Sequence, residues 1–173
     1  MDTDDYFPSG YFTARDAFRS RAAGTEQNSC NIAARGPNGE TLSIDSAYLG
    51  EPKPHQLLII TSGIHGVEGH AGSALQQLWL AEFSSEIPSN TGVLLVHALN
   101  PYGFAHNRRV NEHNVDLNRN ALAAFPGPAN PGYRSLNTWL NPASPAPRFD
   151  NFMWRALPLI MRHGRAALAQ AIA

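Results

Sequence analysis

Two uninterrupted apolar runs, separated by one amphipathic segment, constrain the fold of this chain more than any other feature of its sequence. Leu57–Thr61 and Val93–Ala98 show no alternation of apolar and polar residues, which is typical of strands buried on both faces. Between them, residues 68–83 carry apolar side chains at helical spacing. A strand, a helix and a strand within about 40 residues indicate a parallel βαβ unit. The sequence therefore predicts an α/β fold, with a mostly parallel or mixed sheet and helices on both faces.

The segment before this unit predicts one helix and one hairpin. A helix is expected from Tyr11 to Ala23, with Thr13 as its N-cap and Gly24 at its end. Two shorter strands, 31–35 and 42–49, flank a Gly-Pro-Asn-Gly turn, which favours a hairpin.

The segment after the unit is expected to be largely irregular from Leu99 to about Asn141. A connection of this length inside a compact domain is usually functional or disordered. Helix is expected again over residues 148–173, with a break at Leu157–Pro158 or at Gly164. The prolines before this helix predict a stiff connector: Pro142, Pro145 and Pro147.

Charge and cysteine content exclude several classes of protein. The formal net charge of the 173 residues is -1, without a long run of one sign, which argues against a nucleic-acid or anionic-membrane surface. Cys30 is the only cysteine, so no intrachain disulfide can form. The acidic N-terminus lacks the apolar stretch of a secretory signal, and no apolar run is long enough to span a bilayer. We expect a soluble, cytoplasmic protein.

A His and a Glu three residues apart follow the first apolar run. His65 and Glu68 would supply an imidazole nitrogen and a carboxylate oxygen, both preferred zinc ligands. The glycines among them, Gly63, Gly66 and Gly69, would let the backbone aim both side chains at one point. Taken alone, the pair has a structural interpretation as well, in which His65 binds a loop carbonyl and Glu68 stabilises the start of the helix.

A second group of polar residues follows the second apolar run. The sequence reads Asn100-Pro-Tyr-Gly, then Arg109-Val-Asn, then Asp116-Leu-Asn-Arg-Asn. Together with the His-x-x-Glu pair, and in this order, these elements resemble the M14 metallocarboxypeptidase family. The resemblance is strongest to its bacterial DUF2817 branch and weaker to the succinylglutamate desuccinylase and aspartoacylase branch.

The resemblance implies a role for each matching residue. His65 and Glu68 match the first two zinc ligands, and Asp116 matches the carboxylate that orients the zinc-bound His. Arg109 matches the arginine that polarises the scissile carbonyl. The pair that holds the substrate carboxylate is matched by Asn118 and Arg119.

Structural roles are also open for several of these residues. Arg119 could pair with Asp116 or Glu112 on the surface, and Asn118 could cap a turn. Asn100 is expected to shape a turn rather than touch substrate. The other histidines lack the spacing of a third ligand: His55, His70, His97, His106, His113 and His163.

The resemblance extends only to the first part of the family's domain. The family takes its third zinc ligand, a His, and its general base, a Glu, from positions that would lie beyond Ala173. Residues 1–173 are therefore expected to form the N-terminal part of one zinc carboxypeptidase-like domain, truncated on its C-terminal side. Its sheet would have an unpaired edge and an exposed apolar face, which favour self-association or contact with the missing half.

Two hypotheses of function follow. In the first, the intact protein is a Zn²⁺-dependent hydrolase that cleaves an amide bond next to a free carboxylate, in a peptide C-terminus or in a small N-acyl amino acid, and this chain alone is inactive. In the second, the chain is a non-catalytic remnant or a module that binds carboxylates.

Overall fold

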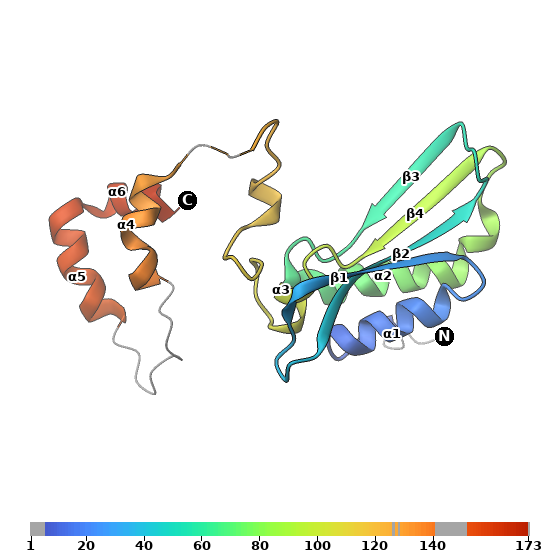
Figure 1. Ribbon diagram of the computed structural model, residues 1–173, viewed down its shortest axis with the longest axis horizontal. Coiled ribbons are helices and arrows are strands. Elements are labelled where there is room, and N and C mark those ends of the chain that lie inside the picture. The colour runs from blue at the N-terminus through green and yellow to red at the C-terminus, as the bar shows by residue number, and fades with distance from the viewer. Residues whose placement is uncertain (1–5, 126, 128, 141–151, 173) are drawn as a thin grey trace. The chain divides into compact units, whose positions relative to one another are not determined.

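The computed structural model describes residues 6–125, 127, 129–140 and 152–172. The chain separates into two compact units, residues 1–121 and residues 122–173 (Figure 1). Whether both belong to one domain, as expected from the sequence, stays a prediction.

The first unit is built on a four-stranded mixed sheet. Its strands are β1 (Glu26–Arg35), β2 (Thr41–Gly50), β3 (Gln56–Thr61) and β4 (Thr91–His97), in the spatial order β1-β2-β4-β3. The pairs β1–β2 and β2–β4 are antiparallel, whereas β3 and β4 are parallel, as the βαβ pattern predicted. The α/β class with a mixed sheet is therefore confirmed.

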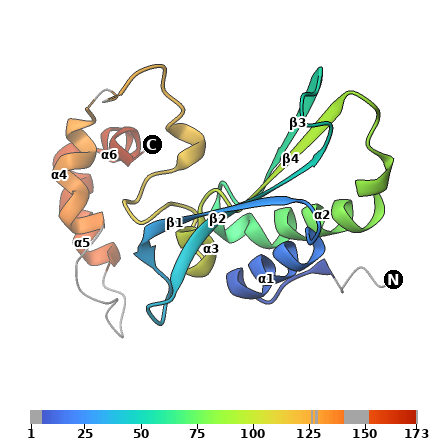
Figure 2. The same ribbon diagram turned by 45° about the vertical axis from the view of Figure 1, so that its right-hand side comes forward.

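Two helices, α1 (Tyr11–Arg21) and α2 (Gly69–Glu82), pack against the same face of this sheet (Figure 2). They share one apolar cluster with the inward side chains of β2 and β4: Phe18, Ala22, Ala47, Leu80, Val93 and Leu95. Arg19 in α1 also pairs with the buried Asp45 in β2 at 2.6 Å. Helices were expected on both faces, but within residues 6–121 the face opposite α1 and α2 carries no helix.

The strand β3 differs from its prediction in burial. Leu57, Leu58 and Ile59 are 53%, 48% and 55% exposed, although their uninterrupted apolar run predicted burial on both faces. The reason is topological. β3 lies at the edge of the sheet beside β4 only, and its outer edge has no strand partner among the described residues. The exposed apolar face expected from the sequence is thus present.

Two boundaries of the N-terminal elements also differ from expectation. The N-cap of α1 is Gly10, and Thr13 lies one turn into the helix, where its Oγ1 accepts a hydrogen bond from the Gly10 N–H at 3.1 Å. The prediction of Thr13 as the N-cap is therefore wrong by three residues. β1 begins at Glu26 rather than Asn31, because its first half is an exposed polar edge without an apolar pattern.

Short helices interrupt the segment expected to be irregular. These are α3 (Pro101–Ala105), η4 (Leu117–Arg119) and α4 (Pro131–Leu140). Two further short helices flank α2, namely η2 (Gly66–Glu68) and η3 (Ser84–Glu86).

The second unit ends in two helices, α5 (Phe152–His163) and α6 (Arg165–Ile172). Gly164, with φ of 77°, separates them, so the predicted break is at Gly164, and Pro158 lies inside α5. Asn141, the predicted proline connector and Arg148 lie outside the described residues. No helix in the described part of the chain is both long and apolar enough to cross a membrane. The cytoplasmic location stays a prediction.

Candidate metal centre at the carboxyl ends of β3 and β4

The segment from Ser62 to Glu68 leaves β3 and places the His-x-x-Glu pair at the carboxyl end of the sheet. Gly63 adopts φ of 63°, and a Cβ there would lie 2.8 Å from that of Ala98, so this turn needs glycine. Gly66 is pressed against α3, since a Cβ there would lie 2.1 Å from the Phe104 backbone nitrogen. These two close approaches fix the backbone on both sides of His65.

His65 lies between two carboxylates. Its Nδ1 is 3.2 Å from Glu68 Oε2, and its Nε2 is 3.1 Å from Asp116 Oδ1. In the tautomer that donates Nε2–H to Asp116, the Nδ1 lone pair points towards the Glu68 carboxylate, so that a metal ion could bind both atoms.

The separation of these two atoms also suits a metal ion. Two ligands about 2.1 Å from a tetrahedral zinc lie about 3.4 Å apart, close to the 3.2 Å between Nδ1 and Oε2. The donor set of one imidazole and one carboxylate therefore fits zinc. No group of three or more His, Cys, Asp or Glu side chains that could hold a metal occurs within residues 6–125, 127, 129–140 and 152–172.

Asp116 connects His65 to Arg109. Its Oδ1 also accepts the Asn118 backbone N–H at 2.9 Å, and its Oδ2 accepts the Arg109 Nε–H at 3.0 Å. Burial would raise the pKa of this carboxyl, but hydrogen bonds from Arg109, His65 and the Asn118 amide outweigh it and hold the pKa below its ordinary value. Asp116 is thus kept ionised, as an orienting carboxylate requires.

Arg109 lies close to both carboxylates that flank His65. Its Nη1 lies 3.7 Å from Glu68 Oε1, and its side chain is half exposed. Its neighbour Arg108 instead donates to Asn114 Oδ1 at 3.1 Å and lies over the ring of Tyr102. Of the two arginines, Arg109 is therefore the one whose guanidinium lies beside Glu68 and Asp116.

The loop that carries Asp116 depends on a residue whose role sequence reasoning missed. The Asn111 side-chain oxygen accepts the backbone N–H groups of His113 and Val115, at 3.0 and 2.9 Å. The Asn111 backbone N–H donates to the Val115 carbonyl at 3.0 Å, which closes the turn. The Arg-x-Asn spacing contained the signal, because Asn side chains build such turns.

A cavity of about 450 Å³ opens beside the pair. It is lined by the residues after β3, by the start of α2 and by Asn118. Arg119 is exposed and is not among the described residues that line this cavity, and its guanidinium donates to the Asn118 carbonyl at 3.4 Å. The structure therefore brings His65, Glu68, Arg109, Asp116 and Asn118 together, but not the guanidinium of Arg119.

Asn100 caps α3, as the turn interpretation predicted. Its Oδ1 accepts the Gly103 N–H at 2.8 Å, and its Nδ2 donates to the Arg109 carbonyl at 3.2 Å. Asn100 thereby links the segment after β4 to the backbone of Arg109.

The other histidines of the first unit that have described contacts bind elsewhere. His70 lies 3.0 Å from the Pro8 carbonyl and His106 2.9 Å from the Arg35 carbonyl. His97 is buried against Ser73, and His113 lies 3.9 Å from Glu112. None of these four joins His65 and Glu68.

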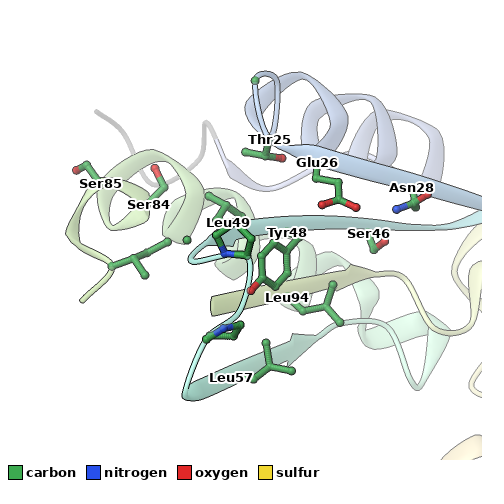
Figure 3. Close-up of a pocket in the computed structure, with 15 residues that line it drawn as sticks. Thr25, Glu26, Asn28, Ser46, Tyr48, Leu49, Leu57, Ser84, Ser85 and Leu94 are labelled. Carbon is green, nitrogen blue, oxygen red and sulfur yellow. The ribbon is translucent and has the colours of Figure 1, made fainter. Parts of the chain in front are cut away.

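A second, larger hollow of about 880 Å³ lies at the opposite ends of β3 and β4 (Figure 3). Its walls include Glu26, Ser46, Tyr48, Leu57 and Leu94. Among the described residues that line it, Glu26 is the one carboxylate and none is a histidine. Tyr48 donates its hydroxyl hydrogen to the Glu51 carbonyl. This hollow has no group of side chains suited to metal-dependent chemistry.

One family pattern, described as "Protein of unknown function (DUF2817)", matches residues 7–173. No curated protein matches the chain significantly.

Among solved structures, a metallo-carboxypeptidase from Pseudomonas aeruginosa, in complex with (2-guanidinoethylmercapto)succinic acid, is 21% identical, with a TM-score of 0.45 over 92% of this chain and 38% of that one. A putative carboxypeptidase A from Shewanella denitrificans is 18% identical, with a TM-score of 0.45 over 66% of this chain and 32% of that one. A glutaminyl cyclase from Tannerella forsythia is 13% identical, with a TM-score of 0.39 over 59% of this chain and 44% of that one.

The chain spans less than half the length of each of these three proteins. All three TM-scores lie below 0.5, so the chemistry of the site has to be argued from the chain's own residues.

Proposed function

This chain belongs to the DUF2817 family, and from that premise we propose that it contributes His65, Glu68 and Arg109 to a zinc-dependent hydrolase site of the metallocarboxypeptidase type. One observation carries the proposal. The imidazole of His65 has a carboxylate at each ring nitrogen: Glu68 Oε2 lies 3.2 Å from Nδ1, and Asp116 Oδ1 lies 3.1 Å from Nε2. A carboxylate, a histidine and a metal in line are the usual arrangement of a zinc-bound His.

The proposed reaction is the hydrolysis of an amide bond next to a free carboxylate. When bound, zinc supplies Lewis acidity for the scissile carbonyl and acidifies a water molecule. Asp116 would accept the Nε2–H of His65 and so direct the Nδ1 lone pair towards the metal. Arg109, which lies 3.7 Å from Glu68, would place a guanidinium beside the charge that develops on the carbonyl oxygen.

Asn118 is the proposed contact for the substrate carboxylate, because it lines the cavity next to His65 and Glu68. Arg119 follows it on an exposed turn, so its guanidinium would have to turn towards the cavity to share this role. Both a peptide C-terminus and a small N-acyl amino acid present the required amide and carboxylate.

Catalytic zinc sites have three protein ligands, and amide hydrolysis also needs a general base. The proposal assigns the third ligand and the base to groups other than the described side chains. The 173 residues alone are then expected to bind zinc weakly and to turn over substrate little or not at all. For this reason the first test is ligand binding rather than turnover.

The test compares two peptides that differ only at the C-terminus, one with a free carboxylate and one amidated, titrated into the zinc-loaded chain by calorimetry. The account predicts tighter binding of the free carboxylate, a loss of this preference in Asn118→Ala, and little change in the control His113→Ala. Equal binding of both peptides would contradict the proposed substrate class. A preference for the carboxylate that persists after zinc is removed by a chelator would indicate a carboxylate-binding module instead.

A further inference from the structure

A buried glutamine in α2 joins the carboxyl ends of β3 and β4. Gln76 is 1% exposed, and its side chain makes three hydrogen bonds. Its Nε2 donates to the carbonyls of Ile60 and Val96, at 3.0 and 3.1 Å. Its Oε1 accepts the Ser62 hydroxyl at 2.9 Å. A buried amide without hydrogen-bond partners would destabilise the fold, so these bonds hold the Gln76 side chain in place.

These contacts lie at the point where β3 ends and the site begins. The Val96 carbonyl, which accepts Gln76, also accepts the Ser62 backbone N–H at 3.0 Å. Beyond this rung the two chains stay joined by Leu99 N–H to the Ser62 carbonyl and Asn100 N–H to the Gly63 carbonyl, each at 2.9 Å. Gln76 thus binds the side chain of Ser62, three positions before His65, and shares the Val96 carbonyl with the Ser62 backbone N–H.

We infer that Gln76 is a positioning residue for the candidate metal pair. It touches neither His65 nor Glu68, but through Ser62 it sets where the segment 62–65 starts. Glu68 stands at the N-terminus of α2, the same helix that carries Gln76. The Gln76 side chain therefore links α2, which begins after Glu68, to the end of β3, which precedes His65. Its loss should change the distance between His65 and Glu68. The predicted change in zinc affinity rests on the proposed function.

Gln77 provides a matched control. It is the next residue of α2 and is 2% exposed, yet neither of the two partners of its side chain belongs to β3 or to residues 62–65. Its Nε2 donates to Ser73 Oγ within α2 at 3.2 Å, and its Oε1 accepts Arg21 Nε–H from α1 at 3.3 Å. Replacing either glutamine by leucine removes one buried amide from the same helix, but only Gln76→Leu releases Ser62.

The experiment measures zinc affinity by calorimetry in the wild-type chain, Gln76→Leu, Gln77→Leu and Ser62→Ala, at a temperature where circular dichroism shows each variant folded. Loss of an outer contact that orients a ligand commonly weakens metal binding by about tenfold or more. Gln76→Leu is expected to show at least that loss, Ser62→Ala about threefold, and Gln77→Leu less than twofold. Equal losses in the two leucine variants, or no loss in Gln76→Leu, would overturn the inference.

Amide hydrogen exchange separates this inference from the proposed function. In Gln76→Leu, the amides of Ser62, Leu99 and Asn100 should exchange at least tenfold faster, while Gln77→Leu leaves them unchanged. If the wild-type chain binds no zinc through His65, the proposed function fails, and the exchange pattern alone decides whether Gln76 positions the segment. Should Gln76→Leu not fold, Ser62→Ala decides, and unchanged zinc affinity with unchanged exchange at Leu99 and Asn100 would overturn the inference.

Discussion

The two hollows of the sheet differ more in chemistry than in size. The one at the amino ends of β3 and β4 is about twice as large, 880 against 450 Å³, but the described residues that line it include one carboxylate, Glu26, and neither histidine nor arginine. The smaller one is lined by His65 and Glu68, which lie within hydrogen-bond or ion-pair distance of Asp116 and Arg109. The largest pocket is the usual first candidate for a site, but in this chain convergence of polar groups is the better guide.

The backbone explains the difference. At the carboxyl end, glycines at 63 and 66 let the chain pass against Ala98 and Phe104, so segments far apart in sequence bring side chains to one point. At the amino end, Gly24 has no heavy atom within 4 Å of its missing side chain, although a Cβ on Gly50 in the same hollow would lie 2.4 Å from the Thr91 carbonyl oxygen. Gly66 and Gly24 should therefore respond differently to substitution.

The largest expected effect is on stability at the carboxyl end. Gly66→Ala would place a Cβ 2.0 Å from the Gly103 carbonyl carbon, with only backbone to move aside. We expect the free energy of unfolding to fall by about 3 kcal/mol or more, measured by urea denaturation. Gly24→Ala at the other hollow strains only its φ of 89° and should cost about 1 kcal/mol. Similar losses of unfolding free energy in the two variants would contradict the difference in packing between Gly66 and Gly24.

A pH effect of slightly smaller size is expected from His97, the last residue of β4. Burial lowers its pKa to about 4, from an ordinary value of 6.5. The unfolded chain then binds the extra proton between these two values, so stability is complete above about pH 6.5 and falls as the pH drops towards 4, by about 3 kcal/mol. Urea denaturation at pH 7 and pH 4 should show a smaller loss in His97→Gln. The same loss in both proteins would show that His97 is not the group responsible.

Zinc affinity should depend on one end of the sheet only. Asp116→Asn keeps the shape of the side chain but removes the charge that orients His65, and we expect zinc binding to weaken by about tenfold to 100-fold. The matched change at the larger hollow, Glu26→Gln, should leave zinc affinity within about twofold. Isothermal titration calorimetry measures both. A comparable loss of zinc affinity in Glu26→Gln would indicate that zinc binds at the larger hollow, and would contradict the proposed site.

The smallest expected change in stability concerns the open face of the edge strand. We propose that β3 mediates self-association, because its exposed apolar run has no charge to prevent pairing between copies. Ile59→Lys should shift sedimentation towards the monomer and change the free energy of unfolding by only about 0.5 kcal/mol. Asn28→Lys, on the polar strand β1, serves as its control. Equal association in wild type and Ile59→Lys would exclude this edge.

The sequence predicts best where one periodicity decides the structure. The apolar runs around residues 57–61 and 93–98 gave two parallel strands with a helix between them, because period and length agree there. Burial of β3 could not be read from its residues, since exposure depends on which elements lie beside it. The start of β1 was missed because its polar first half pairs through backbone groups that any residue carries.

The candidate site was predictable in its members more than in its geometry. The spacing of His65 and Glu68, and the order of the later motifs, selected the residues that the structure brings together. The supporting contacts of Asn111 and Gln76 were not visible in advance, because a single Asn or Gln has no periodicity of its own. Arg119 was selected by its position in the motif, but that position gives no information on where its flexible side chain points.

The zinc content of the chain is the decisive property of a metal centre at His65 and Glu68. The measurement is zinc bound per chain by elemental analysis after equilibrium dialysis, in wild type, His65→Ala and the exposed control His113→Ala. The account predicts zinc in wild type and His113→Ala and its loss in His65→Ala. Equal zinc in all three proteins, or none in wild type at millimolar zinc, would contradict a metal centre at His65 and Glu68.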